Sequence, residues 1–357
     1  MNKASGMNYA PTGKPKQVCV KGEFVFAAMA LDHGHIYGMC NGLVEAGGQV
    51  KYVYDPDPAK VEAFCKAYPG VKPVSCEDEI LQDQEISLVA GAAVTSERCA
   101  VGMRVMDHGK DYFTDKAPFT TLEQLDTAKA KVKETGLKYA VYYSERLHVE
   151  SAVFAGQLIK DGAIGKVLQV IGLGPHRLSA PVRPKWFFER EKYGGILCDI
   201  GSHQIEQYLF FADVKDATVV RSQIANYNHP EYPELEDFGD AMLVGDNGAT
   251  NYFRVDWLTP DGLSVWGDGR TIILGTQGYM ELRKYTDIAR EQKGDHIYLV
   301  NNEGEKHFSV QGQVGFPYFG EFILDCINRT EKAMTQEHTF KAAELCLKAQ
   351  NSAVRIK

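Results

Sequence analysis

The chain has 357 residues, too many for one ordinary hydrophobic core, so two domains are expected. A net charge of −8 and the lack of any Lys/Arg-rich run disfavour nucleic acids and anionic membranes as partners. No apolar run reaches the roughly 18–20 residues of a membrane helix, and the eight scattered cysteines indicate reduced thiols in a cytoplasmic protein. Residues 1–17 lack the apolar core of a signal peptide and are expected to form a flexible arm.

The next part of the chain alternates apolar strands with helices. An unbroken apolar run at 24–31 is typical of a strand buried on both faces of a parallel sheet. Later strands are expected at 50–54, 86–92, 112–114 and 138–143, with helices at 35–46, 59–67, 97–108 and 120–136 between them. Thr120 and Glu123 have the spacing of a capping box for the last of these helices. This alternation predicts a doubly wound parallel α/β domain over residues 18–145.

The second half of the chain has a different pattern. A helix at 149–160 and another that begins near residue 202 precede a series of short strands separated by tight turns. These strands are expected at 218–226, 241–244, 250–257, 271–275, 279–284, 296–300 and 306–310. They predict a mostly antiparallel sheet within a second domain, residues 146–357, which ends with helices near 319–328 and 340–352.

The turn after the first strand is the expected binding place of a dinucleotide pyrophosphate, on backbone N–H groups at a helix N-terminus. The usual Gly-x-Gly-x-x-Gly pattern is absent, because Ala30, Asp32 and His35 stand at the glycine positions. We expect Gly34 to permit close approach in a shifted loop, whereas Asp32 is a poor neighbour for a pyrophosphate unless it caps backbone N–H groups. His33 or His35 would then donate to phosphate. The alternative is a degenerate turn that binds no nucleotide.

Asp55 ends the second strand, where a carboxylate can accept both ribose hydroxyls of an adenosine and repel a 2′-phosphate. No Arg follows it at once, so NAD is favoured over NADP; a simple turn acid is the alternative. Asp32, His33 and His35 also raise the question of a metal site. Alternating residues of a tight turn rarely converge on one ion, and no further ligand set follows, so no metal is expected.

The stretch from residue 194 to residue 206 is the strongest chemical signal. The glycine pair Gly194 and Gly195 suggests close approach to something bound. Ser202 is a candidate N-cap, which would put His203 in the first helical turn and Asp199 in the loop before it. An imidazole beside a carboxylate can move a proton near neutral pH, whereas a structural buried histidine is the alternative.

Two other places favour ligand binding. Lys116 follows a strand, so it should lie at the carboxyl edge of the parallel sheet, where such folds bind ligands. In residues 175–188, the ring of Trp186 could stack on sugar C–H groups while Arg177 donates to hydroxyls. A lid packed by its own aromatic residues is the alternative for this segment.

The order of these motifs resembles the Gfo/Idh/MocA family, the glucose–fructose oxidoreductase and inositol dehydrogenase group. Asp115-Lys116-Ala117-Pro118 is similar to its Glu-Lys-Pro motif, and the stretch 194–203 is similar to its Gly-Gly…Asp-x-Gly-x-His motif. Residues 159–167 and 274–278 are similar to its Ile-Gly-Lys-Val entry strand and its Gly-Thr-x-Gly turn. The resemblance runs from about Val18 to the C-terminus.

The resemblance implies a Rossmann domain and then an α/β domain whose large, mostly antiparallel sheet commonly forms a dimer or tetramer interface. It implies NAD(P)-dependent oxidation or reduction of a carbinol of a sugar or cyclitol. We expect the substrate to be a carbohydrate, cyclitol or glycoside that binds between the two domains. Lys116 would hold the reacting hydroxyl, His203 would be the acid/base, and Asp199 would bind or orient the substrate. The full predicted site comprises Asp32, His33, Gly34, His35, Asp55, Ala93, Val94, Asp115 and Lys116 toward the cofactor, and Arg146, Arg177, Trp186, Asp199 and His203 toward the substrate.

Three departures from the family pattern leave alternatives open. The glycine pattern is rewritten, Asp115 stands for the usual Glu, and Ala117 interrupts the Lys-Pro pair. One alternative is a glycosidase or lyase that keeps its NAD and oxidises the sugar only transiently. Another is a non-catalytic sugar or nucleotide sensor, against which the joint presence of Lys116, Asp199 and His203 argues.

Overall fold

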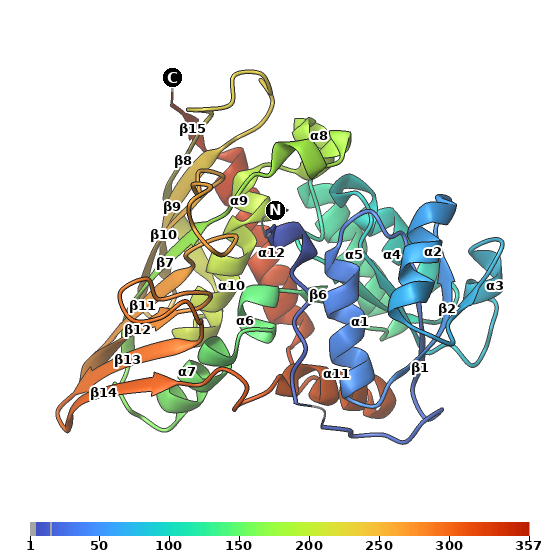
Figure 1. Cartoon of the computed structure of the whole chain (residues 1–357), viewed down its shortest axis with the longest axis horizontal. Coiled ribbons are helices and arrows are strands. Elements are labelled where there is room, and N and C mark those ends of the chain that lie inside the picture. The colour runs from blue at the N-terminus through green and yellow to red at the C-terminus, as the bar shows by residue number, and fades with distance from the viewer. Residues whose placement is uncertain (1–4, 15, 357) are drawn as a thin grey trace. The chain divides into compact units, whose positions relative to one another are not determined.

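The computed structural model describes residues 5–14 and 16–356, which form two compact units (Figure 1). Of the described residues, one unit holds those within 7–142 and 315–340, and the other holds Ser5, Gly6, 143–314 and 341–356. We expected a single change of domain at 145/146. The contacts put the first change at 142/143 and return a C-terminal segment to the first unit.

The first unit is built on a six-stranded sheet of order β3-β2-β1-β4-β5-β6. Its strands are β1 (Val25–Met29), β2 (Gln49–Tyr54), β3 (Lys72–Pro73), β4 (Leu88–Gly91), β5 (Asp111–Asp115) and β6 (Tyr139–Tyr142). All neighbouring strands are parallel. Every residue of β1, β4, β5 and β6 is buried, which explains their continuous apolar sequences. The predicted doubly wound parallel sheet is confirmed.

Helices connect these strands, and a further helix, α11 (Pro317–Asn328), comes from the C-terminal segment of this unit. The connecting helices are α1 (His35–Glu45), α2 (Pro58–Ala67), α3 (Asp78–Leu81), α4 (Arg98–Asp107) and α5 (Leu122–Thr135), with a 3₁₀ turn η2 (Thr95–Glu97) before α4. The predicted capping box is displaced by one residue. Thr121, not Thr120, caps α5, because its Oγ1 accepts the N–H of Gln124 at 3.2 Å. Thr120 instead bonds to the side chain of Gln124.

The second unit is built on a nine-stranded sheet of order β14-β13-β12-β11-β7-β10-β9-β8-β15. Its strands are β7 (Val167–Pro175), β8 (Ala217–Ala225), β9 (Phe238–Gly245), β10 (Thr250–Asp256), β11 (Arg270–Gly275), β12 (Gly278–Arg283), β13 (His296–Asn301), β14 (Gly304–Ser309) and β15 (Val354–Arg355). Among the described strand pairs of this second sheet, only β7–β10 and β8–β15 are parallel. The predicted, mostly antiparallel sheet is confirmed.

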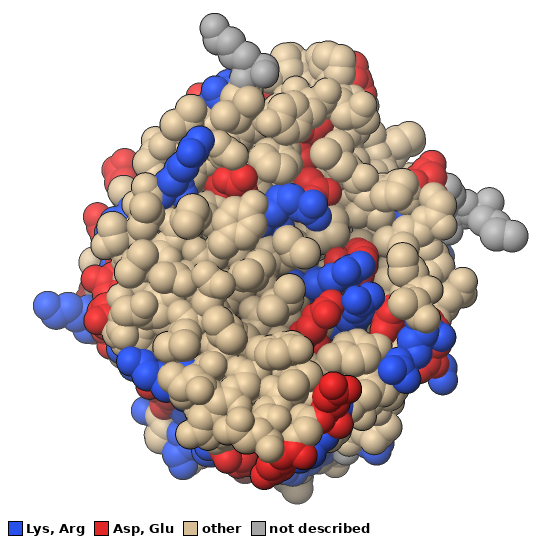
Figure 2. All heavy atoms as spheres, turned by 90° about the vertical axis from the view of Figure 1, so that its left-hand side faces the viewer, with Lys and Arg blue, Asp and Glu red and all other residues tan. Residues whose placement is uncertain are grey.

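Helices of the second unit cover one face of this sheet (Figure 1). They are α6 (Ser144–Leu147), α7 (Glu150–Lys160), α8 (Arg190–Tyr193), α9 (Ile196–Asp199), α10 (Gly201–Phe211) and most of α12 (Gln336–Asn351), with 3₁₀ turns η3 (Ala180–Val182) and η4 (Lys185–Phe188). Figure 2 looks at the left-hand side of Figure 1, where the sheet lies, and shows a broad area with few charged side chains.

The predicted N-terminal arm is packed where it is described. Its residues 1–4 and 15 lie outside the described residues. Gly6–Asn8 forms a 3₁₀ turn, η1, and Ser5 and Gly6 are buried. Gly13 donates its N–H to the carboxylate of Glu45 on α1 at 3.0 Å. Among the described residues, no helix combines the length and hydropathy needed to cross a membrane.

Candidate functional site

The turn between β1 and α1 is closely packed. His33 donates its backbone N–H to the carbonyl of Ala92, just after β4, at 2.9 Å. Gly34 precedes the first residue of α1, and a Cβ on it would lie 2.5 Å from the carbonyl oxygen of Met7. The space that this glycine leaves open is therefore taken by the N-terminal segment of the chain. Contact between Gly34 and a pyrophosphate stays a prediction, and it requires Met7 and Asn8 to share or leave this place.

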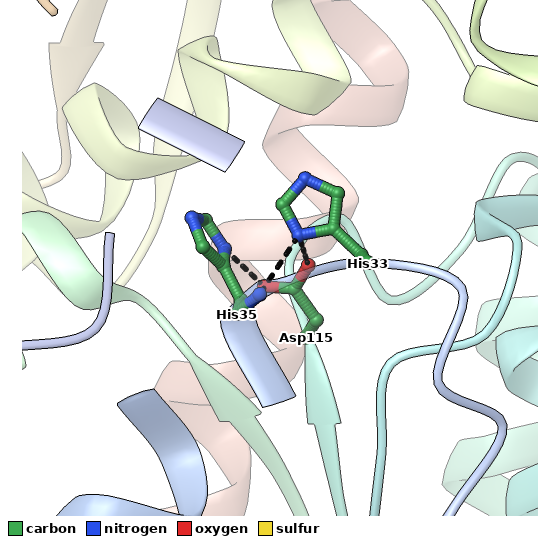
Figure 3. Close-up of side chains that lie close together, drawn as sticks. All are labelled: His33, His35 and Asp115. Atoms are coloured by element: carbon green, nitrogen blue, oxygen red, sulfur yellow. Dashed lines mark hydrogen bonds and ion pairs between the residues drawn. The ribbon is translucent and has the colours of Figure 1, made fainter. Parts of the chain in front are cut away.

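Two of the predicted residues of this turn meet Asp115 at the end of β5 (Figure 3). Nδ1 of His35 lies 2.9 Å from one carboxylate oxygen of Asp115, and Nδ1 of His33 lies 3.2 Å from the other. Nδ1 of His33 also accepts the backbone N–H of His35 at 3.2 Å. All three side chains are buried. Segments 80 residues apart in the sequence thus form one polar cluster.

The charges of this cluster follow from burial and neighbours. Burial lowers the pKa of His33 well below its ordinary value, and the nearby cationic groups act in the same direction. Burial alone would raise the pKa of Asp115, but His35 and Arg98 hold it well below its ordinary value. His33 is therefore neutral at physiological pH, while Asp115 is ionised.

Arg98 at the start of α4 completes the cluster, although no pattern in the sequence indicates its role. Its side chain is 1% exposed. The guanidinium donates to the carbonyl of Ala93 (2.9 Å), to the carbonyls of Lys116 and Ala117, and to the carboxylate of Asp115 (3.1 Å). One side chain thus fixes the loops that follow β4 and β5, where ligands of such sheets bind. Both loops carry predicted site residues.

These contacts suit a hydrogen-bonded network better than a metal centre. The ligand atoms of His33, His35 and Asp115 do lie within 4.8 Å of one another. The carboxylate of Asp115, however, already makes hydrogen bonds with the backbone N–H of Lys116 (2.8 Å), the ring of His35 and the guanidinium of Arg98. The positive charges of Arg98 and Lys116, which both act on His33, would also repel a metal ion.

The strand-end carboxylate predicted to select the cofactor is buried and well anchored. Asp55 accepts the N–H of Leu31 at 2.6 Å and the N–H of Asp57 at 2.9 Å, which ties it to the β1–α1 turn. Each carboxylate oxygen can accept two hydrogen bonds, so capacity for ribose hydroxyls remains. Lys60 lies 2.6 Å from Asp32 and 3.5 Å from Asp55. Two acids and one lysine leave a net negative charge, which fits a ribose diol and opposes a 2′-phosphate.

Lys116 directly follows β5 and is 5% exposed. Its backbone N–H bonds to the carboxylate of Asp115, and its carbonyl accepts from Arg98. The peptide bond between Lys116 and Ala117 is cis. Ala93 and the residue after it follow β4, the strand next to β5. The carboxyl ends of these two strands thus bring the predicted cofactor-side residues to one edge of the sheet.

The motif in the second unit is placed somewhat differently from our expectation. Asp199 is the last residue of α9 rather than part of a loop. Ser202 does not cap α10; its Oγ donates to the carbonyl of Asp199 at 2.8 Å, and Ile200 precedes the helix without a side-chain cap. The reason is that α9 leads almost directly into α10, so no extended N-cap residue is present. His203 lies in the first turn of α10, 2% exposed, as predicted.

The residues of the 175–188 segment have structural partners. Nη2 of Arg177 donates to the carbonyls of Pro260 (3.1 Å) and Leu263 (2.7 Å). Trp186 is half-buried and its ring centroid lies 5.9 Å from that of Phe187. Substrate contact by Arg177 and Trp186 therefore stays a prediction.

The remaining arginines also hold the fold. Arg146 on α6 pairs with the buried Glu206 of α10, with Nε 2.6 Å from the carboxylate, and lies over the ring of Phe210. Arg183, which we had not singled out, is buried over the rings of Phe187 and Trp257. Burial lowers its pKa to about 10, and the charge of Asp199 opposes this shift. Substrate contact by Arg146 stays a prediction.

The second unit also contains a cluster of buried polar side chains that no sequence pattern indicates. Glu145, His176, Gln204 and Lys284 are all buried and lie together, although they come from α6, the end of β7, α10 and the end of β12. Residues spread over about 140 positions leave no local pattern by which they could be found.

Comparison with known proteins gives a consistent result over both units. Residues 28–143 match the model of an oxidoreductase family with an NAD-binding Rossmann fold, and residues 153–281 match the GFO/IDH/MocA C-terminal domain. A crystal structure of a protein from Erwinia carotovora atroseptica SCRI1043, described as an oxidoreductase, is 51% identical with a TM-score of 0.91. That alignment covers 94% of this chain and 100% of the other.

Two characterised relatives are more distant. The NAD(+)-dependent scyllo-inositol 2-dehydrogenase of Bacillus subtilis (strain 168) is 27% identical over 72% of this chain and 71% of the relative. D-xylose dehydrogenase of Paenarthrobacter nicotinovorans is 27% identical over 53% of this chain; the chain spans about half (48%) of that relative's length. The Rossmann sheet, the second sheet and both matched domains show that the chain belongs to the Gfo/Idh/MocA family of oxidoreductases.

Proposed function

We propose that the protein is an NAD-dependent oxidoreductase that oxidises a secondary hydroxyl of a sugar, cyclitol or glycoside. The observation that carries this proposal is the placement of Lys116 at the carboxyl edge of the NAD-binding sheet, in a loop held by Asp115 and Arg98. Relatives named scyllo-inositol 2-dehydrogenase and D-xylose dehydrogenase support the substrate class.

The residues have the following proposed roles. NAD, when bound, accepts a hydride from the carbinol carbon. Lys116 holds the reacting hydroxyl, and His203 takes up its proton, so that a ketone, NADH and one proton are formed. Asp199 orients the substrate. His33 would donate a ring N–H toward the pyrophosphate, and Asp55 would accept the ribose hydroxyls of the adenosine.

The test is turnover on protein freed of bound ligand. We expect NADH to accumulate with at least one member of a panel of aldoses, inositols and glycosides. Product formation without net NADH would instead indicate the glycosidase or lyase alternative. Cofactor binding without turnover of any polyol would indicate a sensor.

We further propose that the open face of the nine-stranded sheet joins copies of this chain into a dimer or tetramer. Its side chains include Met242, Val244, Leu274 and Tyr279, each 40–49% exposed. Strand register puts Met242 and Val244 on one face of β9, while Leu274 and Tyr279 pair directly across β11 and β12. An apolar face of this kind is typical of an interface (Figure 2).

Sedimentation velocity tests this assembly. We expect the wild-type protein to sediment as a dimer or tetramer and the Leu274→Arg variant to shift toward the monomer. A monomeric wild-type protein at micromolar concentration would refute the proposed interface.

A further inference from the structure

Glu145 on the short helix α6 is a buried acid with one oxygen fully engaged. The residue is 2% exposed. Its Oε2 accepts from Nζ of Lys284 at 2.9 Å and from Nε2 of Gln204 at 3.0 Å. The side chain of Lys284 is 0% exposed, so this ion pair is shielded from water. Burying both charges is costly, and a pair of well-packed apolar residues often stabilises a fold equally well.

The other oxygen of the same carboxylate has no donor. Within residues 5–14 and 16–356, Oε1 of Glu145 is buried and makes no hydrogen bond. Nε2 of His176 is 3.8 Å away, beyond hydrogen-bond distance. Burial alone would raise the pKa of Glu145, but Lys284, His203 and His176 hold it well below its ordinary value. The unsatisfied oxygen therefore belongs to an ionised carboxylate, which is a strong acceptor.

The carboxylate of Glu145 lies near the proposed acid/base, His203. Gln204, which bonds to Glu145, directly follows His203 on α10, and Glu145 and His203 also interact electrostatically. The side chain of Gln204 is held in place by β7, where a Cβ on Gly172 would lie 2.2 Å from its Oε1. Contacts from Lys284 and Gln204 thus hold one oxygen of Glu145, and Oε1 is the oxygen without a donor.

We propose that Oε1 of Glu145 accepts a hydrogen bond from a non-reacting hydroxyl of the substrate and thereby selects polyols over singly hydroxylated alcohols. This inference rests on the proposed function and adds a specificity residue to it. Lys284 and Gln204 hold Oε2, so that Oε1 keeps one direction. A substrate that lacks the matching hydroxyl leaves a buried charge without a donor, which is a strong basis for rejection.

The experiment compares Glu145→Gln with the wild-type protein on D-xylose, D-glucose, myo-inositol and scyllo-inositol, and on monodeoxy analogues of the best substrate. We expect KM for the polyol to rise roughly 10- to 100-fold and KM for NAD to stay unchanged. In the wild type, one deoxy analogue should lose roughly 10- to 100-fold in kcat/KM, and the variant should no longer distinguish it from the parent.

Two further variants keep the test decisive. Glu150→Gln is a matched control, because Glu150 is also buried and its carboxylate accepts the N–H groups of Gly312 and Val314. It should lower stability and leave the deoxy penalty intact. If Glu145→Gln does not fold, because Lys284 loses its counter-ion, the Glu145→Gln/Lys284→Met double variant replaces it with the same expectation.

The outcomes separate this inference from the proposed function. A Glu145 variant that keeps the wild-type KM and deoxy penalty overturns the inference and leaves the function standing, with Oε1 then serving only a structural water. Calorimetric binding of a polyol that depends on Glu145, without oxidation, overturns the function and supports the inference. A wild-type protein that neither binds nor oxidises any polyol of the panel overturns both.

Discussion

Arg98→Lys is the substitution for which the structure gives the clearest magnitude. The guanidinium of Arg98 reaches the carbonyls of Ala93, Lys116 and Ala117 and the carboxylate of Asp115 at once. A lysine keeps the charge but concentrates its donors on one atom, so it cannot span these four acceptors. At least two buried acceptors then lose their donor.

The expected cost follows from that number. Each unsatisfied buried acceptor costs about 1–3 kcal/mol, so Arg98→Lys should lower the free energy of unfolding by about 2–6 kcal/mol. Because the turn around Lys116 loses its support, kcat should also fall by roughly 100-fold. Stability is measured by urea denaturation, and kcat by NADH formation with the best polyol.

Arg104→Lys is the matched control on the same helix. Arg104 makes a two-pronged ion pair with Glu77, but both side chains are substantially exposed. Breaking such a surface pair should cost less than about 1 kcal/mol and leave kcat unchanged. Equal stability and equal kcat for the two lysine variants would show that the network around Arg98 does not position Lys116.

The remaining predictions concern catalysis, cofactor choice and pH. Lys116→Met and His203→Ala should each lower kcat by roughly 10²–10⁴-fold with an unchanged circular dichroism spectrum, and wild-type turnover would remove that residue from the mechanism. Asp55→Asn keeps an acceptor for Leu31 but loses the charge, so calorimetry should show the preference for NAD over NADP narrowed by roughly 10-fold; an unchanged ratio would contradict its role. Burial raises the pKa of Asp295 to about 6. A raised carboxyl pKa makes the folded state lose stability as pH rises from about 4 to 6, so Asp295→Asn should add about 1–3 kcal/mol at pH 7 and little at pH 4 in urea denaturation. Equal effects at the two pH values would refute this assignment.

The sequence predicted the sheets well because their signals are local. The buried run that contains β1 and the alternating pattern of β10 and β11 each reflect the surroundings of that strand alone. The sequence does not predict that α11 returns to the first unit. The apolar face of an amphipathic helix shows that the helix packs on something, but not on which sheet it packs. The start of α5 was displaced because two neighbouring hydroxyl residues, Thr120 and Thr121, compete for one cap position. Ser202 does not cap α10, because α9 leads almost directly into that helix.

The candidate site was predictable only in part, for a related reason. Lys116 and His203 lie beside strand-end and helix-start patterns that can be recognised from short segments. Arg98 and Glu145 act through partners 17 to 19 and 59 to 139 positions away. Such long-range pairs become visible only when the fold brings the elements together. At Gly34 the sequence correctly indicates a close approach but not the partner, because the close neighbour is Met7 of the same chain and not a bound nucleotide.

The most direct test of the central claim is the balance between NADH formed and polyol oxidised by the ligand-free protein. The proposed dehydrogenase predicts one NADH for each molecule of ketone, with NAD preferred to NADP. Conversion of a polyol or glycoside without net NADH, or no conversion of any member of the panel, would contradict it.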